Sequence, residues 1–415
     1  MNPTIKARIE SIRRGEVPEG YKRTKAGIMP VPWCKEKTYQ AKDLFVSVSD
    51  KKHGGTLEVL SATQDRGIVP RRLVDIDIKY DDSNLGTYKK VDKGDFVISL
   101  RSFQGGIEYS DYVGIVSPAY TVVRSKQKIV SGYYKAYFKT EDFIKRLNIG
   151  TYGIRDGKQV SFDDFGDMVL HYPPVNEQEK IAEILAGQDR VIALKEKLLA
   201  EKQKQKKYLM QQLLTAKKRL PGFSGEWKKV RMGTYVNFQV GYPFSSLHFN
   251  EEGKGLRLIK NRDLKTDDQI YYTTEHYSQD FVVTNGDVLI GMDGDFLPCV
   301  WNKGRALLNQ RVGKIFVASG MDLMFSYYCL HIPLEKLSSK IGATTVKHLA
   351  HKDVESLFVF IPIEKPEQIA IAEILSTADK EIELLKKDIE QEKLKKKSLM
   401  QLLLTGIVRV DELVS

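Results

Sequence analysis

Cysteine is scarce in this chain. Only three cysteines, Cys34, Cys299 and Cys329, occur among 415 residues, and they form no CxxC pair. This usage argues against a disulfide framework and against structural zinc, and it is typical of a reducing compartment. The first residues are polar and charged, unlike a secretory signal peptide, and no apolar run is long enough to span a bilayer. We therefore expect a soluble, cytoplasmic protein that binds no membrane.

Motifs that bind nucleotides or activate nucleophiles are also missing. The sequence has no GxxxxGK[ST] loop, no GxGxxG turn after a strand, no GxSxG elbow and no Asn-Pro-Pro-aromatic motif. His348 and His351 form an HxxH, but without a nearby acidic ligand a polar surface is the better interpretation than a metal site. Asp293 and Asp295 resemble the carboxylates of metal-dependent nucleases only faintly. We expect no catalytic residue, metal or cofactor in this chain.

Acidic residues are fewer than basic ones, 54 against 65, which gives a formal net charge of +11. This excess favours an anionic partner such as nucleic acid, although many intracellular proteins are mildly basic. Hydrophobic residues make up 42% of the chain, enough for a substantial core in each of two or three domains.

The strongest positive feature is a long helical segment that occurs twice. Residues 177–220 and 367–410 align without a gap, and nearly half of the aligned positions are identical. A globular stretch precedes each copy, so the chain is a tandem of two similar units rather than a solenoid. In the first stretch, short β-rich runs such as 44–48 and 95–100 alternate with turn residues, which predicts a β-rich α+β domain. The predicted segments are an N-terminal helix and linker (1–30), a first β-rich domain (31–174), a central helix (175–219), a second β-rich domain (220–364), a C-terminal helix (365–407) and a tail (408–415).

Apolar residues recur along both long helices at spacings of three and four, the pattern of a coiled-coil seam. Two matched seams in one chain most simply pack on each other and form a rigid spacer. The pattern does not distinguish parallel from antiparallel packing; antiparallel packing would relate the halves by a pseudo-two-fold axis. Lysine runs at 202–207 and 393–397 are either a solvated face or a surface for phosphate groups. The seam residues are Ile181, Leu185, Ile192 and Leu199 in the first helix and Ile371, Leu375, Ile382 and Ile389 in the second.

Polar side chains gather on turn-rich segments of both globular stretches. Arg and Lys can bind guanine edges in the major groove of DNA, and Asn and Gln can bind adenine edges. Each residue alone is equally consistent with an ordinary hydrophilic loop. The candidates are Arg101, Ser102, Gln104, Arg155, Lys158 and Gln159 in the first domain, and Lys260, Asn261, Arg262, Asn309, Gln310, Arg311, Lys347 and His348 in the second.

The whole chain resembles the specificity (S) subunit of type I restriction–modification enzymes. The resemblance depends on PPVNEQEKIAEIL and QQLLTAKKRLPGFSGEWKKV around the first helix, and on IPIEKPEQIAIAEIL and MQLLLTGIVRV around the second. GTYGIRDGKQVSFDDFGDMVLHYPPVNEQ is similar to the end of a family target recognition domain.

The resemblance implies an α+β protein with two target recognition domains, 31–174 and 220–364, joined by two helices in an antiparallel coiled coil. Each domain would read half of a split, asymmetric double-stranded DNA target, and the helices would set the gap and bind two modification subunits. The chain itself would not be an enzyme. Those partners would supply S-adenosylmethionine and methylate adenine, and restriction subunits would use ATP and Mg in defence against foreign DNA.

Two alternatives come from other classes of protein. A coiled-coil adaptor without DNA-reading function would also carry two β-rich domains on long helices. An enzyme would need an unrecognised carboxylate site at Asp293 and Asp295. The first domain has Arg101 where the second has Asp293, so these two residues are not expected to act alike. An Asp there suits a cytosine amino group or no base contact.

Overall fold

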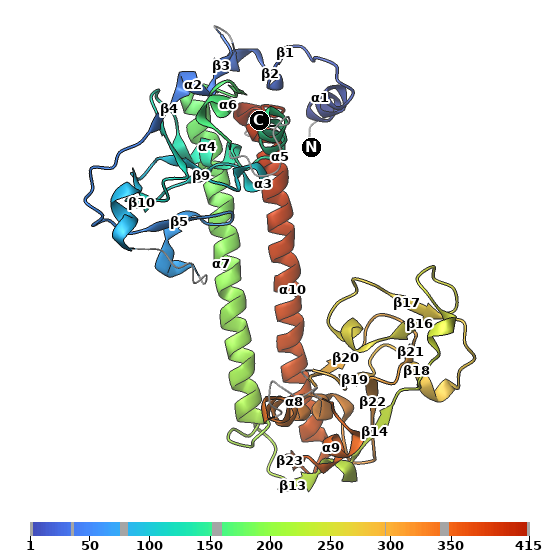
Figure 1. Cartoon of the computed structure of the whole chain (residues 1–415). Coiled ribbons are helices and arrows are strands. Elements are labelled where there is room, and N and C mark those ends of the chain that lie inside the picture. Colours follow the sequence, from blue (N-terminus) through green and yellow to red (C-terminus); the bar gives the residue numbers. More distant parts are fainter. Residues whose placement is uncertain are drawn as a thin grey trace. The chain divides into compact units, whose positions relative to one another are not determined.

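The computed structural model divides the chain into two compact units. The first unit contains residues 1–196 and 388–415, and the second contains residues 197–387. Helices α7 (Val175–Leu213) and α10 (Lys365–Leu404) are each shared between the units, so every unit holds one β-rich domain and a portion of both long helices (Figure 1). The structure describes residues 3–34, 37–74, 82–151, 160–294, 296–340 and 348–412.

The first unit is built around the four-stranded antiparallel sheet β4-β11-β8-β9 (Figure 1). Two-stranded antiparallel pairs surround it: β1 with β2, β5 with β6, β7 with β10 and β3 with β12. The elements are α1 (Pro3–Arg13), β1 (Tyr21–Thr24), β2 (Gly27–Pro30), β3 (Tyr39–Gln40), α2 (Ala41–Leu44), β4 (Phe45–Val48), β5 (Leu60–Thr63), β6 (Gly67–Pro70), β7 (Lys89–Val91), β8 (Phe96–Ile98), α3 (Ser102–Gly105), β9 (Glu108–Tyr109), β10 (Gly114–Val116), β11 (Thr121–Ser125), α4 (Ser131–Tyr137), α5 (Glu141–Thr151), α6 (Phe162–Gly166) and β12 (Val169–Leu170).

The second unit repeats this plan with the sheet β14-β22-β19-β20, whose strand order matches that of the first unit. It adds the mixed sheet β15-β17-β16-β21-β18, in which β16 and β21 run parallel, and the pair β13 with β23. The elements are β13 (Trp227–Arg231), β14 (Val236–Val240), β15 (Phe249–Asn250), β16 (Leu256–Ile259), β17 (Tyr271–Thr273), β18 (Val282–Val283), β19 (Val288–Gly291), β20 (Pro298–Val300), β21 (Ala306–Leu308), β22 (Val312–Val317), α8 (Leu323–Lys340), α9 (His351–Ser356) and β23 (Phe358–Pro362).

Each unit has one main core that joins its sheet to the long helices. In the first unit the core is rich in aromatic rings, and Phe45 contacts Phe96 and Tyr134 edge to face with ring centroids 5.8 and 5.4 Å apart. Ile181 of α7 and Leu404 of α10 belong to the same core. Because edge-to-face rings add favourable contacts to apolar burial, this packing fixes the domain firmly on its helix portions.

The long helices run antiparallel within each unit. In the first unit Asp189 of α7 pairs with Lys396 of α10 at 2.6 Å, while Lys195 further along α7 pairs with Asp388 at 2.8 Å. Residue numbers thus rise on one helix as they fall on the other. The second unit has the same relation, since Lys202 pairs with Glu381 and Lys206, further along α7, pairs with Asp379. The expected antiparallel coiled coil is therefore confirmed within both units.

The lysine runs contribute to these helix pairs. Lys206 contacts Asp379 at 2.5 Å, and Lys393 contacts Glu196 at 3.1 Å. Both pairs are partly exposed, where an ion pair typically contributes under about 1 kcal/mol of stability. The arrangement favours the interpretation of the runs as a charged, solvated face over a surface reserved for phosphate.

Candidate functional site

Three separate segments of the second domain meet at Asp293, directly after strand β19. The Asp293 Oδ1 atom lies 3.2 Å from Nδ1 of His348 and 3.5 Å from Nη1 of Arg311. The two nitrogen atoms are 3.1 Å apart. Asn261 Nδ2 donates a hydrogen bond of 2.8 Å to the Asp293 carbonyl oxygen. The sequence candidates Asn261, Arg311 and His348 are thus brought together around Asp293, with Arg311 and His348 at its carboxylate and Asn261 at its backbone carbonyl.

The backbone holds this cluster in place. Met292 N donates to the Arg311 carbonyl oxygen at 3.0 Å, and Leu349 N donates to the Met292 carbonyl oxygen at 2.8 Å. Asp293 and His348 also form an isolated antiparallel bridge. Gly291 is required beside them, because a Cβ at this position would collide with the Asn261 side chain.

The cluster is exposed enough to meet a partner. The side chains of Arg311, His348 and Asp293 are 53%, 46% and 35% exposed. Ion pairs this exposed add little to stability, so their effect is to orient the guanidinium and the imidazole. Among the described residues, Asp293 faces two nitrogen groups and no second carboxylate. Asp295 lies outside the described residues.

Other candidates in the second domain have different surroundings. Asn261 donates to Asp293, and its Oδ1 atom is buried without a hydrogen bond among the described residues, so its amide is not presented to an adenine edge. Asn309 is 9% exposed and accepts a hydrogen bond from the backbone of its exposed neighbour Gln310. Both asparagines therefore shape the loops that carry Arg311 and Asp293.

Lys260 and Arg262 flank the cluster and turn toward Tyr271 on β17. The Lys260 Nζ atom lies 3.1 Å from the centroid of the Tyr271 ring, and Arg262 lies 5.3 Å from it. Burial lowers the pKa of Lys260. Arg262 also donates to Gln269 Oε1 at 3.0 Å. Cation–π attraction to the Tyr271 ring therefore limits the motion of both side chains.

In the first domain the candidates fall on the segment after strand β8. Arg101 and Gln104 are exposed, whereas Ser102 is fully buried and its hydroxyl accepts a hydrogen bond of 2.9 Å from Ser99 N. Ser102 therefore shapes this turn, and Arg101 and Gln104 remain its accessible candidates. Arg155, Lys158, Gln159 and, in the second domain, Lys347 lie outside the described residues.

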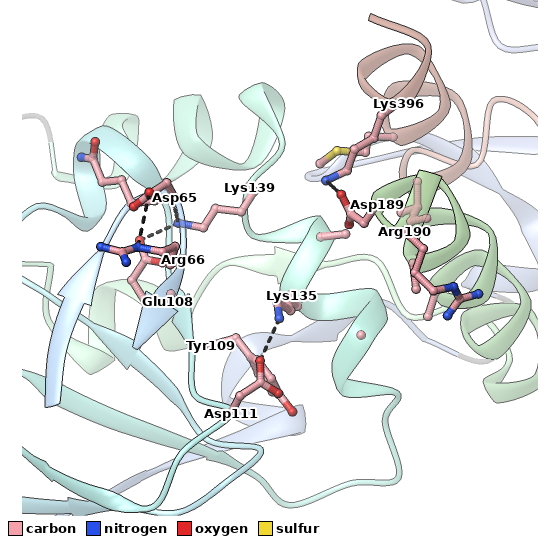
Figure 2. A pocket seen from close by; sticks show the side chains of 18 residues that line it. Asp65, Arg66, Glu108, Tyr109, Asp111, Lys135, Lys139, Asp189, Arg190 and Lys396 are labelled. Carbon is pink, nitrogen blue, oxygen red and sulfur yellow. Dashed lines mark hydrogen bonds and ion pairs between the residues drawn. The ribbon is translucent and has the colours of Figure 1, made fainter. Parts of the chain in front are cut away.

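A cleft of about 700 Å³ lies within the first unit between the β-rich domain and the helices (Figure 2). Three of its carboxylates face lysines: Asp111 with Lys135 at 3.0 Å, Glu108 with Lys139 at 2.5 Å, and Asp189 with Lys396 at 2.6 Å (Figure 2). A fourth, Asp65, pairs with Arg66. Burial raises the pKa of Glu108. A lining of matched pairs lacks the single sign of charge that would favour a phosphate backbone. Among the described residues, no group of three His, Cys, Asp or Glu side chains is arranged to hold a metal.

Most of the predicted seam residues are buried: seven are buried, and Leu199 is half-buried. Four of the buried residues, two from each helix, belong to the cores that also contain the β-rich domains. A protein partner would therefore meet the outer faces of the helices. Leu194 on α7 is 67% exposed, and Leu384, which occupies the same position in the second copy of the repeat, is 65% exposed. The seven buried residues are Ile181, Leu185, Ile192, Ile371, Leu375, Ile382 and Ile389.

Sequence reasoning missed a pair of buried clamps at the helix starts. Glu177 accepts hydrogen bonds from Trp33 Nε1 at 2.9 Å and from Arg409 at 2.5 and 2.6 Å. Its counterpart in the second unit, Glu367, is fully buried and accepts from Trp227 and Arg219. The sequence did contain a signal for these clamps, because the same three residue types, Trp, Glu and Arg, occur at corresponding positions in both copies of the repeat.

The adjacent glutamines complete the clamps. Gln178 accepts a hydrogen bond from Val130 N at 2.9 Å and donates to the Pro173 carbonyl oxygen at 2.8 Å. Gln368 does the same with Asp322 N and the Pro362 carbonyl oxygen. Because buried polar groups are costly when unpaired, these contacts fix each β-rich domain on the helix that follows it.

Comparison with known proteins supports the repeat. A family model described as the type I restriction modification DNA specificity domain matches residues 35–204 and again 224–393. The EcoBI specificity subunit of a type I restriction enzyme from Escherichia coli is 34% identical over 167 residues, which are 40% of this chain and 35% of that protein. The MjaVIII specificity subunit from Methanocaldococcus jannaschii is 27% identical over 354 residues, 78% of this chain and 81% of that protein.

Solved structures share the fold at low sequence identity. One chain, from a study of complex assembly and conformational transition of the type I R-M system, aligns with a TM-score of 0.57 and 16% identity over 95% of this chain and all of that one. The S subunit of a type I restriction–modification system from M. genitalium aligns with a TM-score of 0.55 and 13% identity, covering 88% of this chain and 95% of that chain. In the part of the chain that the structure describes, every helix is too short or too polar to cross a bilayer.

Proposed function

This chain belongs to the type I restriction–modification DNA specificity family, and on that premise we propose that its two domains read the two halves of a split, asymmetric DNA target. The chain would select the sequence, and its partner subunits would carry out the chemistry. The net charge of +11 supports an anionic partner of this kind.

The observation that carries the proposal is the contrast between two equivalent positions. Sheets β4-β11-β8-β9 and β14-β22-β19-β20 have the same strand order, so the segments after β8 and β19 correspond. The first presents an exposed Arg101, and the second presents the pair of Asp293 with Arg311. Since one segment presents a guanidinium by itself and the other presents a guanidinium beside a carboxylate, the two domains offer different groups to the base edges, and unlike half-sites are expected.

We further propose that two copies of a modification subunit dock on the outer faces of the long helices. Leu194 and Leu384 support this proposal because each is a large, exposed apolar side chain at the same position of the repeat. A repeated surface binds two copies of one partner more simply than two different partners. The modification subunits would supply S-adenosylmethionine. Restriction subunits would carry out the reactions that need ATP and Mg.

The test is a methylome. The full chain and the modification subunit of its system would be co-produced in a host without adenine methylation of this type, and methylated adenines would be mapped across the host genome. We expect one split motif with two unlike halves and a fixed gap. An assembled complex that adds no methylation would contradict DNA specificity and would favour an adaptor.

A further inference from the structure

The cluster at Asp293 identifies the base that one domain reads. Resting on the proposed function, we propose that Arg311 recognises the guanine of a G·C pair in one half-site, with Asp293 as its positioning residue. Arg311 places a guanidinium with five N–H donors on the surface, and it is 53% exposed. Guanine offers two adjacent acceptors in the major groove, O6 and N7, which match a guanidinium fork.

Asp293 makes a base contact more favourable than a phosphate contact. Its carboxylate lies 3.5 Å from Arg311 Nη1 and is itself 35% exposed. A carboxylate this close would repel the phosphate backbone and would weaken a contact that depends on charge alone. Guanine carries no net charge, so the same carboxylate opposes its O6 and N7 acceptors less than it opposes a phosphate. Base edges, and not phosphates, therefore suit the combined charge of this cluster.

The guanidinium is held before DNA arrives. Nη1 of Arg311 lies 3.5 Å from the Asp293 carboxylate, and the Arg311 carbonyl oxygen accepts from Met292 N. Among the described residues, Nε and Nη2 of Arg311 have no hydrogen-bond partner, so two donor atoms, with three N–H groups, remain for the two guanine acceptors. A side chain that is fixed in its bound geometry loses less conformational entropy on binding. The exposed guanidinium of Arg101 has no comparable carboxylate partner among the described residues, so it lacks this advantage.

The test compares single substitutions within the complete methylating complex. Arg311→Ala removes the guanidinium. Arg311→Lys keeps the positive charge but cannot form the pair of parallel hydrogen bonds that a guanidinium makes. We expect both to convert one guanine of the motif into a degenerate position, with discrimination falling about 10- to 100-fold, while the other half-site and the gap stay the same. Arg305→Ala is the matched control, since Arg305 is an exposed cation of the same domain that lies outside the cluster and bonds to Gln279. It should leave the motif intact.

Asp293→Asn tests the positioning effect, and Asp293→Glu tests its rescue. Binding of the complex to duplexes with each of the four base pairs at the guanine position gives a readout that a purely structural contact would not change. We expect Asp293→Asn to reduce the preference for guanine and Asp293→Glu to restore part of it. Equal weakening on all four duplexes in Arg311→Ala would assign Arg311 to phosphate or to structure and would overturn the inference. An unchanged guanine requirement would overturn it as well. Failure of the proposed function is distinct, because the wild-type complex would then produce no split motif.

Discussion

At the scale of single residues, the two helix C-termini offer a matched pair of substitutions. Ala216 follows α7 with φ of 55°, and Gly406 follows α10 with φ of 72°, at the same position of the repeat. L-residues with a Cβ are strained in this region, whereas glycine is not. We expect Ala216→Gly to stabilise the second unit by about 1 kcal/mol, measured by chemical denaturation of the full chain.

The reverse change at Gly406 should destabilise the first unit. A Cβ there would lie 2.6 Å from Pro30 Cδ and 2.9 Å from the Trp33 ring, so steric conflict adds to backbone strain. Gly406→Ala is therefore the control of opposite sign. Equal effects of the two substitutions would show that backbone conformation at this position does not limit stability.

His331 predicts a pH dependence of stability. Its Nε2 atom is buried without a hydrogen bond among the described residues, and burial together with nearby Lys206 lowers its pKa to about 4, against an opposing effect of Asp379. Below about pH 6.5 His331 is protonated in the unfolded chain, whereas in the folded chain it stays neutral until about pH 4. Stability should therefore fall as the pH drops through this window, by about 2–3 kcal/mol from His331.

The measurement compares wild type with His331→Leu in denaturant titrations between about pH 7 and about pH 4.5. This range begins just above the ordinary histidine pKa of about 6.5. The variant should lose less stability on acidification than wild type. His276→Leu is the control, because His276 is exposed and its removal should not change the slope. Identical slopes for wild type and His331→Leu would contradict the argument.

At the scale of elements, we expect the two long helices to determine the gap in the target. Both pass from one unit to the other and pair antiparallel in each, so a change of length in only one helix would break the ion pairs of the other. We expect a seven-residue insertion in α7 near residue 197, matched by one in α10 near residue 387, to preserve the seam and add about 10 Å of rise. The methylated motif should keep its half-sites and gain about three base pairs of gap.

An insertion of seven residues in α7 alone is the control for this experiment. It should abolish assembly or methylation, because the apolar residues of the α10 seam would no longer face those of α7. A matched double insertion that changes a half-site while the gap stays constant would exclude the helices as the spacer.

The exposed leucines carry a second prediction at this scale. Leu194→Asp and Leu384→Asp should each reduce the number of bound modification subunits from two to one, because a charge cannot be buried in an apolar contact without a large cost. Native mass spectrometry of the complex gives the count, and the double variant should bind none. Leu247→Asp is a control, since Leu247 is 90% exposed and belongs to the second domain rather than to either long helix.

The sequence was informative where structure is local and uninformative where it is not. Strand β4 (Phe45–Val48) falls within the predicted run 44–48, because β-branched and aromatic residues bounded by turn residues favour strands. The predicted helix ends were less accurate: α7 ends at Leu213 rather than near residue 219, since Ala216 rather than a glycine adopts the terminal conformation. The contact of Asp293 with Arg311 and His348 could not be predicted, because loop conformation joins residues that have no shared periodicity.

At the scale of the whole molecule, the repeat predicts that the domains are interchangeable. Each is fixed by the same clamp, with Trp33 and Glu177 in one unit and Trp227 and Glu367 in the other. A variant chain would carry a second copy of residues 220–364 in place of residues 31–174. We therefore expect this chain to fold and to assemble with the modification subunit. Its methylome should contain the half-site of the second domain twice, and we expect an inverted repeat because the pseudo-two-fold axis expected from the sequence would reverse one copy. A direct repeat would contradict the antiparallel relation, and retention of the original asymmetric motif would show that the first domain does not read DNA.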